Sequence, residues 1–334
     1  VRRRIAPCGR KPFSRPSGPI AMSKKKDTPR PLPDTLGLPP TGADSHAHLD
    51  SEGLFERLPE VMERARNAGL ATIGQVFLSP SAYYEHRDAF AAHPGVFFML
   101  GIHPCDGQEC TGAVLKAMRD AFAGDDRLRA VGEIGLDFFW EDCPHFIQEE
   151  AFRVQLALAK ERDLPVVIHS RDAARDSLRV LEAEGFAGRP VLWHCFSGDA
   201  VEHLDRFLAN GWHISIPGPV TYPANHDLRE AVKRIPADRL MIETDCPYLS
   251  PVPWRGKPNE TAFAAFTAEA VARERGEDPA ELWTRCGDTT RRFFGVTPPE
   301  TVAFGGVRSA SRETSRRPLF RPLNVDMFQQ GILT

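Results

Sequence analysis

The stretch QEEAFRVQLALAKERDLPVVIH, residues 148–169, joins a helical pattern to a buried strand. Its first part, Gln148–Arg162, has apolar residues three and four positions apart from Phe152 onward, which predicts a helix with one apolar face. Its last part, Leu164–His169, is nearly continuously apolar, as in a parallel strand whose two faces are both buried. A helix followed directly by such a strand predicts an alternating α/β fold.

The same alternation extends through the middle of the chain, where eight short β-type runs are separated by helical patterns. The runs are Thr41–His46, Leu70–Phe77, Val96–His103, Leu128–Ile134, Leu164–His169, Pro190–His194, Gly211–Ile216 and Arg239–Glu243. Eight strands, each followed by a helix over roughly 255 residues, predict an α/β fold of the (β/α)8 TIM barrel type. A doubly wound open sheet is the alternative, but no Gly-rich phosphate fingerprint follows any of the runs.

One helix boundary is predicted from its end residues. Asp199 precedes the pattern Ala200–Leu208 and has the side chain of an N-cap. Asn210 and Gly211 follow it and are typical of a helix end.

Charge divides the chain into three parts. Residues 1–40 carry a net charge of +8, residues 41–296 carry 27 basic and 40 acidic side chains for a net of −13, and residues 297–334 carry +2. The two ends lack apolar periodicity, so we expect a basic Pro-rich N-terminal tail, one barrel domain over 41–296 and a loosely ordered C-terminal tail. Translation from Met22 would make residues 1–21 a gene-boundary artefact, and a basic nucleic-acid-binding arm is the alternative.

The sequence has no sign of membrane insertion or export. It contains no run of 18 apolar residues, so we expect no transmembrane helix. It also lacks the apolar stretch of a secretory signal. Its seven cysteines are odd in number and never spaced C-x-x-C, so we expect reduced thiols in a cytoplasmic protein.

Metal-binding side chains recur where the predicted strands end. His46 and His48 are two positions apart on one strand, so both can reach the same ion. Any one of these residues alone is equally consistent with a structural role, such as a salt bridge. Active sites of (β/α)8 barrels, however, assemble from several strand ends at one face. The six side chains expected to converge there are His46, His48, Glu133, His169, His194 and Asp245. These six side chains are enough to bind two metal ions if one of the carboxylates binds both ions.

The chain resembles the TatD family of metal-dependent deoxyribonucleases over residues 41–296. The matching segments are DSHAHLD (44–50), GIHP (101–104), GEIGLDFF (132–139), VVIHSRDA (166–173), HCFSG (194–198), SIPG (215–218), ETDCPYLSPVPWRGKPNE (243–260) and residues 289–295. Departures are small: Trp254 stands where His or Tyr is frequent, and Thr289 where Asn is frequent. Neither position binds metal, and Trp254 is expected to alter the substrate rim.

The resemblance implies a role for each candidate ligand. It assigns one ion to His46, His48 and Asp245, the other to His169 and His194, and the bridging position to Glu133. It also implies that His103 contacts phosphate or substrate, although a hydrogen bond to backbone would explain this histidine equally well.

Other residues near the strand ends are candidates for substrate binding. Arg171 lies two positions after His169 and could pair with a phosphate through two hydrogen bonds, with an ordinary salt bridge as the alternative. Asp137 and the aromatic residues 138–140 follow Glu133, and the aromatics either stack on a base or cover the barrel rim.

The reaction expected from this site is phosphodiester hydrolysis at a DNA end. A water activated between two divalent ions would attack phosphorus, with Glu133 bridging the ions and Asp245 orienting the water and accepting its proton. Four imidazoles suit zinc or manganese better than magnesium, although the resemblance implies that magnesium or manganese can support turnover. The acidic body favours a short single-stranded end over a long duplex, and we expect a monomer.

Three other functions are compatible with the sequence. An amidohydrolase acting on a cyclic amide or phosphotriester also begins with H-x-H, but commonly bridges its metals with a carboxylated lysine where this chain has Glu133. Removal of a D-aminoacyl group from tRNA uses the same kind of water. A non-catalytic binding module would not need all six ligand positions filled.

Overall fold

Eight parallel strands form one sheet, ordered β1 to β8, in the computed structural model, which describes residues 29–297. The strands are β1 (Gly42–Ala47), β2 (Leu70–Phe77), β3 (Val96–Leu100), β4 (Leu128–Asp137), β5 (Val166–Arg171), β6 (Val191–Trp193), β7 (His213–Ile216) and β8 (Leu240–Ile242). A parallel bridge between Ala47 and Cys246 joins β1 to the segment after β8. The sheet is therefore a nearly closed barrel, which confirms the predicted fold.

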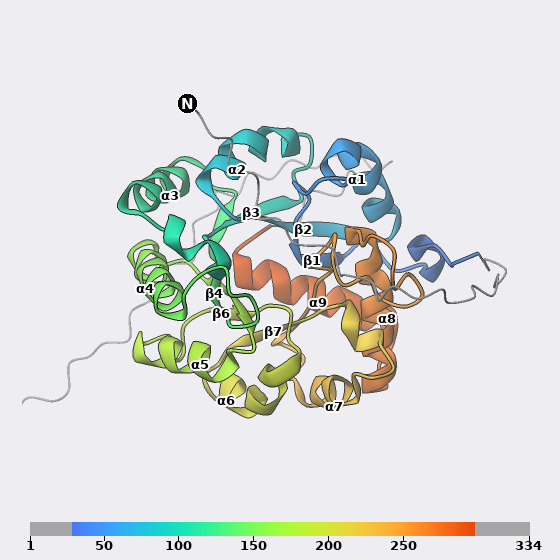
Figure 1. Ribbon diagram of the computed structural model, residues 1–334. Helices are drawn as coiled ribbons and strands as arrows, with labels where there is room; N and C mark the ends of the chain where they lie inside the picture. Colours follow the sequence, from blue (N-terminus) through green and yellow to red (C-terminus); the bar gives the residue numbers. More distant parts are fainter. Residues whose placement is uncertain (1–28, 298–334) are drawn as a thin grey trace, which may run out of the picture. The chain divides into compact units, whose positions relative to one another are not determined.

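Helices surround the strands in the described part of the chain (Figure 1). They are α1 (Leu58–Asn67), α2 (Pro80–His86), α3 (Gly112–Gly124), α4 (His145–Arg162), α5 (Ala174–Ala183), α6 (Leu204–Ala209), α7 (His226–Arg234), α8 (Ala264–Arg275) and α9 (Pro279–Phe294). The helix predicted over 148–162 is the greater part of α4. No helix in residues 29–297 is both long enough and apolar enough to cross a membrane.

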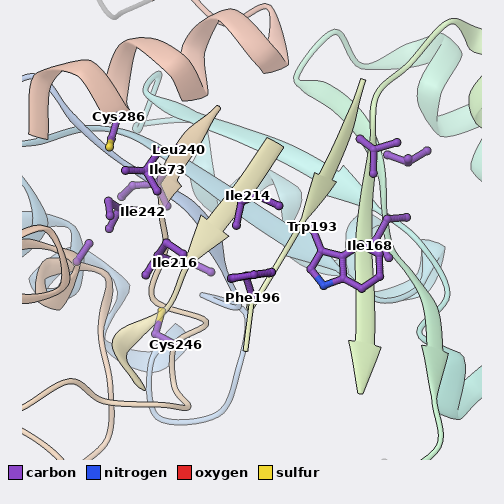
Figure 2. Packing of buried hydrophobic residues seen from close by; sticks show 14 of the residues in the cluster. Ile73, Ile168, Trp193, Phe196, Ile214, Ile216, Leu240, Ile242, Cys246 and Cys286 are labelled. Carbon is purple, nitrogen blue, oxygen red and sulfur yellow. The ribbon is translucent and has the colours of Figure 1, made fainter. Parts of the chain in front are cut away.

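The hydrophobic core has two layers. The outer layer lies between strands and helices, and Figure 2 shows part of it, including Trp193, Ile214 and Ile216. The inner layer fills the barrel with residues such as Met99 and Val167. Strands with apolar side chains on both faces produce two layers, which is why the sequence shows continuous rather than alternating apolar runs.

Helix α9 covers the end of the barrel where the strands begin. The Trp283 indole N–H donates to the Pro39 carbonyl at 3.0 Å, and Arg291 donates to the Thr41 carbonyl at 2.9 Å. Phe294 belongs to the inner layer and packs against Phe97, with ring centroids 4.5 Å apart. This end is closed, so a site in the barrel can open only at the carboxyl ends of the strands.

Six of the eight predicted strands end at a different residue in the structure, four of them by one or two residues and the third and fourth by three. The third ends at Leu100 instead of His103, because the amide of Gln155 on α4 hydrogen-bonds both the N–H and the carbonyl of Ile102. The fourth continues past Ile134 to Asp137 and pairs with β5 along its whole extension.

The predicted cap of the sixth helix is wrong. The 3-10 helix η5 (Gly198–His203) precedes α6, and Asp199 lies inside it. The Asp199 carboxylate instead accepts the N–H of Ala174 at 2.8 Å, at the start of the neighbouring α5. The predicted end is correct, because α6 stops at Ala209 before Asn210 and Gly211.

Most of the predicted tails, residues 1–28 and 298–334, lie outside the described residues. From Arg30 the described chain contacts the barrel, and it forms the 3-10 helix η1 (Pro33–Leu36). Arg30 donates to the Pro253 carbonyl at 2.9 Å, and the Trp254 indole donates to the Pro31 carbonyl at 2.9 Å. Trp254 thus contacts the N-terminal segment. The six described cysteines are free thiols.

Candidate metal centre

The first group of candidate ligands comes from the two ends of the sheet. On β1, Asp44 accepts hydrogen bonds from the backbone N–H and the hydroxyl of Thr244, at 2.9 and 2.6 Å. This joins β1 to the segment after β8 and brings Asp245 beside the histidines. The Asp245 Oδ1 atom lies 3.3 Å from His48 Nε2 and 3.8 Å from His46 Nε2, and the two Nε2 atoms are 3.3 Å apart.

Glu133, near the middle of β4, lies between two pairs of imidazoles. Its Oε1 atom is 2.7 Å from His169 Nδ1 and 3.2 Å from His194 Nε2. Its Oε2 atom is 3.5 Å from His46 Nε2 and 3.6 Å from His48 Nε2. The two carboxylate oxygens therefore face different imidazoles, as those of a carboxylate placed between two cations would.

The surrounding charges favour an ionised Glu133. Burial alone would raise the pKa of this carboxyl, but the rings of His194, His169 and His46 outweigh it and lower the pKa well below its usual value. Asp245 behaves in the same way: burial opposes the charge, while His48 and His194 lower the pKa of the carboxyl. Both carboxylates are therefore anionic at neutral pH.

His194 is held by a carboxylate that the sequence analysis missed. Glu243 is fully buried, with Oε1 3.3 Å from His194 Nδ1, and it also accepts the Cys195 N–H at 2.7 Å. Burial disfavours a charged His194, but Glu243 and Glu133 raise the pKa of the ring well above its usual value. The available signal was a carboxylate ending the predicted run Arg239–Glu243, since such a group is costly to bury without a partner.

His169 has a carboxylate at each ring nitrogen. Its Nδ1 atom faces Glu133, and its Nε2 atom lies 2.9 Å from Asp137 Oδ2. The strands approach closely here, because a Cβ atom at Gly135 would collide with the carbonyl oxygen of His169. A metal bond at one ring nitrogen would leave the carboxylate on the other to orient the ring.

His103 follows β3 and also faces Glu133, with its Nε2 atom 3.7 Å from Glu133 Oε1. The N–H of Cys105 donates to His103 Nδ1 at 3.2 Å. With Nδ1 as an acceptor, the proton of the neutral ring is on Nε2, on the side of the candidate centre.

The geometry of these side chains fits metal binding. Two nitrogens that bind one zinc ion at about 2.1 Å each lie roughly 3.4 Å apart at the tetrahedral angle. The Nε2 atoms of His46 and His48 have this separation at 3.3 Å. Four groups of three ligand atoms in the described chain are close enough to hold an ion: His46–His48–Asp245, His46–Glu133–His194, His103–Glu133–His169 and His103–Cys105–Asp137.

The structure brings all six predicted ligands together, but it divides them differently from the implied assignment. His194 groups with His46, whereas His169 groups with His103, and Glu133 belongs to both groups. Arg171 does not join the cluster. Its guanidinium lies over the ring of Phe139, 3.7 Å from the centroid.

Comparison with known proteins identifies relatives across the barrel. The family model for TatD related DNase matches residues 43–295. The chain is 36% identical over 253 residues to YabD of Bacillus subtilis, an uncharacterized metal-dependent hydrolase, covering 76% of this chain and 98% of the relative. It is 37% identical over 246 residues to a protein of Rahnella named 3′-5′ ssDNA/RNA exonuclease TatD, and the match covers 71% of this chain and 92% of the relative.

Solved structures share the fold of this chain. The crystal structure of YjjV, a TatD homologue from Escherichia coli K12, superposes with a TM-score of 0.71 and 27% identity, covering 77% of this chain and 99% of that one. A phosphotriesterase homology protein from Escherichia coli superposes with a TM-score of 0.58 and 14% identity, which shows a shared fold only.

Proposed function

The chain belongs to the TatD-related DNase family of metal-dependent hydrolases, and we propose that it is an exonuclease that hydrolyses phosphodiester bonds at the ends of single-stranded DNA. The observation that carries this proposal is the position of Glu133 between two pairs of imidazoles, with Asp245 beside one pair. The name of the Rahnella relative supports a single-stranded substrate.

We assign two divalent cations to this site, zinc or manganese in preference to magnesium. The first would be held by His46, His48 and Asp245, the second by His169 and His194, and Glu133 would contact both. The close grouping of the first set supports its assignment most directly. When bound, such cations neutralise the phosphate and lower the pKa of a nucleophilic water from about 15.7 toward neutrality.

Asp245 is the proposed proton acceptor. Its side chain is 15% exposed, against 5% for Glu133, so it is the more accessible carboxylate at the open end of the barrel. One of its oxygens contacts His48, which fixes its orientation toward the centre. An ionised carboxylate held in this way can orient a water and take its proton.

His103 and Arg171 are the proposed substrate contacts. The Nε2 proton inferred for His103 points toward Glu133, so a phosphate bound there would meet a hydrogen-bond donor. Arg171 supplies a cation beside the centre in a domain whose net charge is −13. Binding then depends on a few local contacts rather than on a broad basic surface, which favours short single-stranded ends.

Metal analysis by mass spectrometry and a nuclease assay on 3′- and 5′-labelled single strands test this function. We expect bound divalent metal and stepwise release of nucleotides that a chelator abolishes. A protein that hydrolyses a dihydroorotate-like amide or a D-aminoacyl-tRNA but leaves DNA intact would overturn the proposal.

The role of Glu133 is tested by Glu133→Ala. We expect loss of turnover with an unchanged circular dichroism spectrum, because the substitution removes the carboxylate common to both groups of imidazoles. Glu85→Ala, at an exposed position on α2, is the matched control and should retain full activity. Unchanged nuclease activity in Glu133→Ala would exclude the assigned role.

A further inference from the structure

Beside the candidate metal centre, the loop after β4 exposes an unusual group of aromatic side chains. Six large hydrophobic residues are exposed in the described chain, and two of them, Phe139 and Trp140, are neighbours on this loop. A third, Phe146, lies at the start of α4. Phe139 is 48% exposed and Trp140 is 36% exposed. Exposed aromatics gathered at one place are typical of a binding surface rather than of a random surface.

A cation completes this surface. The Arg171 guanidinium lies 3.7 Å from the ring centroid of Phe139 and 5.8 Å from that of Trp140. The two rings are nearly perpendicular, with centroids 4.9 Å apart. Among residues 29–297 no carboxylate forms an ion pair with Arg171, although the domain has an excess of acidic side chains. Its charge is therefore available to an anion.

The surface is held in place by the residues that hold the centre. Asp137 Oδ1 accepts the N–H groups of Phe139 and Trp140, at 3.0 and 3.1 Å. The other oxygen of Asp137 lies 2.9 Å from His169. The Phe138 N–H donates to the Arg171 carbonyl at 2.9 Å, which ties the loop to β5. Because this surface is already ordered, it loses little conformational entropy when a ligand binds.

The position of Arg171 relates this surface to the reaction. Arg171 lies two residues after His169 on β5, so the two side chains point to the same side of the strand. His169 in turn contacts Glu133 at 2.7 Å. A group bound by Phe139, Trp140 and Arg171 would therefore lie at the open end of the barrel, next to a phosphate in the centre.

We propose that Phe139, Trp140 and Arg171 form a nucleotide-binding platform, on which an unpaired nucleobase stacks while Arg171 contacts the adjoining phosphate. The inference rests on the proposed function and specifies how that site would select single strands. The occupant follows from chemistry: a nucleotide combines a flat π surface with an anion, and the platform offers aromatic rings beside an unpaired cation. A paired base cannot reach such a platform, because its faces are covered by its neighbours in the duplex.

The test compares the double variant Phe139→Leu/Trp140→Leu with the native protein, both metal-loaded. One substrate is a single strand with ordinary bases, and the other has abasic residues at its ends. We expect KM for the ordinary strand to rise by about 5-fold to 100-fold, with kcat within about twofold. The abasic strand should give equal KM values for the two proteins. Arg171→Gln should raise KM for both strands, because it removes a phosphate contact.

Tyr84→Leu is the matched control, since Tyr84 is 48% exposed on the distant helix α2 and also lies beside an arginine. Binding of a hydrolysis-resistant phosphorothioate strand, measured by fluorescence anisotropy, separates this inference from the proposed function. The native protein could cleave no DNA and still bind the base-containing strand more tightly than the abasic one. If the double variant lost that preference, the result would support the platform and contradict the proposed nuclease activity.

Two results would overturn the platform. In the first, the native protein is an active nuclease and the double variant has the same KM for the ordinary strand as the native protein. In the second, the native protein sediments as a dimer and the double variant as a monomer, while KM is unchanged. That result would assign the aromatic surface to self-association.

Discussion

Each ionisable side chain at the centre has more than one charged or polar partner, and these partners together set its charge and orientation. Glu133 would be a poor anion if it were buried alone, but it is surrounded by imidazoles that stabilise its charge. His194 and His169 each meet Glu133 on one side and a further carboxylate, Glu243 or Asp137, on the other. These further carboxylates orient the rings, as the outer partners of metal-binding histidines commonly do.

A histidine far from this centre predicts how stability depends on pH. His213 begins β7 at the closed end of the barrel, against Phe293. Burial lowers the pKa of His213 to about 4, with Arg239 and Arg292 acting in the same direction and Asp238 opposing them. The unfolded chain takes up this proton near pH 6.5, whereas the folded chain takes it up only near pH 4. Stability is therefore lost as the pH falls through this window.

The substitution His213→Gln should remove this part of the pH dependence, which amounts to at most about 3 kcal/mol. Urea unfolding at pH 7 and at about pH 4.5 measures it, and the native protein should lose more stability between the two values than the variant. His226→Gln, at an exposed position on α7, should behave like the native protein. Equal losses in the native protein and His213→Gln would refute the assignment.

At the scale of elements, segments from neighbouring βα units support one another. The extension of β4 to Asp137 aligns Asp137 with Arg171 on β5, so the loop after β4 and the end of β5 meet at the open end. Asp199 connects the next two units, because it sits in η5 and accepts the Ala174 N–H at the start of α5. The start of α5 therefore depends on a residue 25 positions away.

Replacing Asp199 with alanine should destabilise the protein by about 1 kcal/mol, because a helix N–H would lose its acceptor. Urea or thermal unfolding measures the change. Glu202→Ala is the matched control, since Glu202 lies exposed in the same 3-10 helix, and its effect should stay within about 0.5 kcal/mol. Equal effects of the two substitutions would show that the Asp199 contact contributes nothing to stability.

At the scale of the molecule, charge and shape direct any nucleic acid to one place. Residues 41–296 carry a net charge of −13, so this part of the chain repels the backbone of a long duplex. Helix α9 closes one end of the barrel (Figure 1). The six candidate ligands and Arg171 come from the carboxyl-terminal parts of the strands and the segments that follow them, at the other end. Within residues 41–296, we therefore expect attraction to a phosphate at the open end.

We expect DNA binding to depend on bound metal and only weakly on salt, since few phosphate contacts are made outside the centre. Binding of a phosphorothioate single strand, measured between about 50 and 200 mM salt with and without a chelator, tests this. The affinity should fall little with salt and strongly with the chelator. A steep loss with salt that is unaffected by the chelator would instead point to an extended basic surface.

The local pattern of the sequence was enough to predict the barrel and the residues that meet at its open end. Continuous apolar runs identify strands buried on both faces, and parallel strands in a barrel necessarily place their carboxyl ends together. His46, Glu133 and Asp245 could therefore be grouped without knowing any contact between them. These inferences need only spacing along the chain and one rule of topology.

Only the tertiary structure decided which atoms face each other. Three contacts join residues from different βα units. They are the pairing of His194 with Glu243, the grouping of His169 with His103, and the hydrogen bond of Asp199 to the start of α5. Such contacts depend on strand register and on how side chains pack across the barrel, and neither is encoded in the spacing of residues within one segment. The exposed platform of Phe139 beside Arg171 has the same origin, because pairing of β4 with β5 brings the two together.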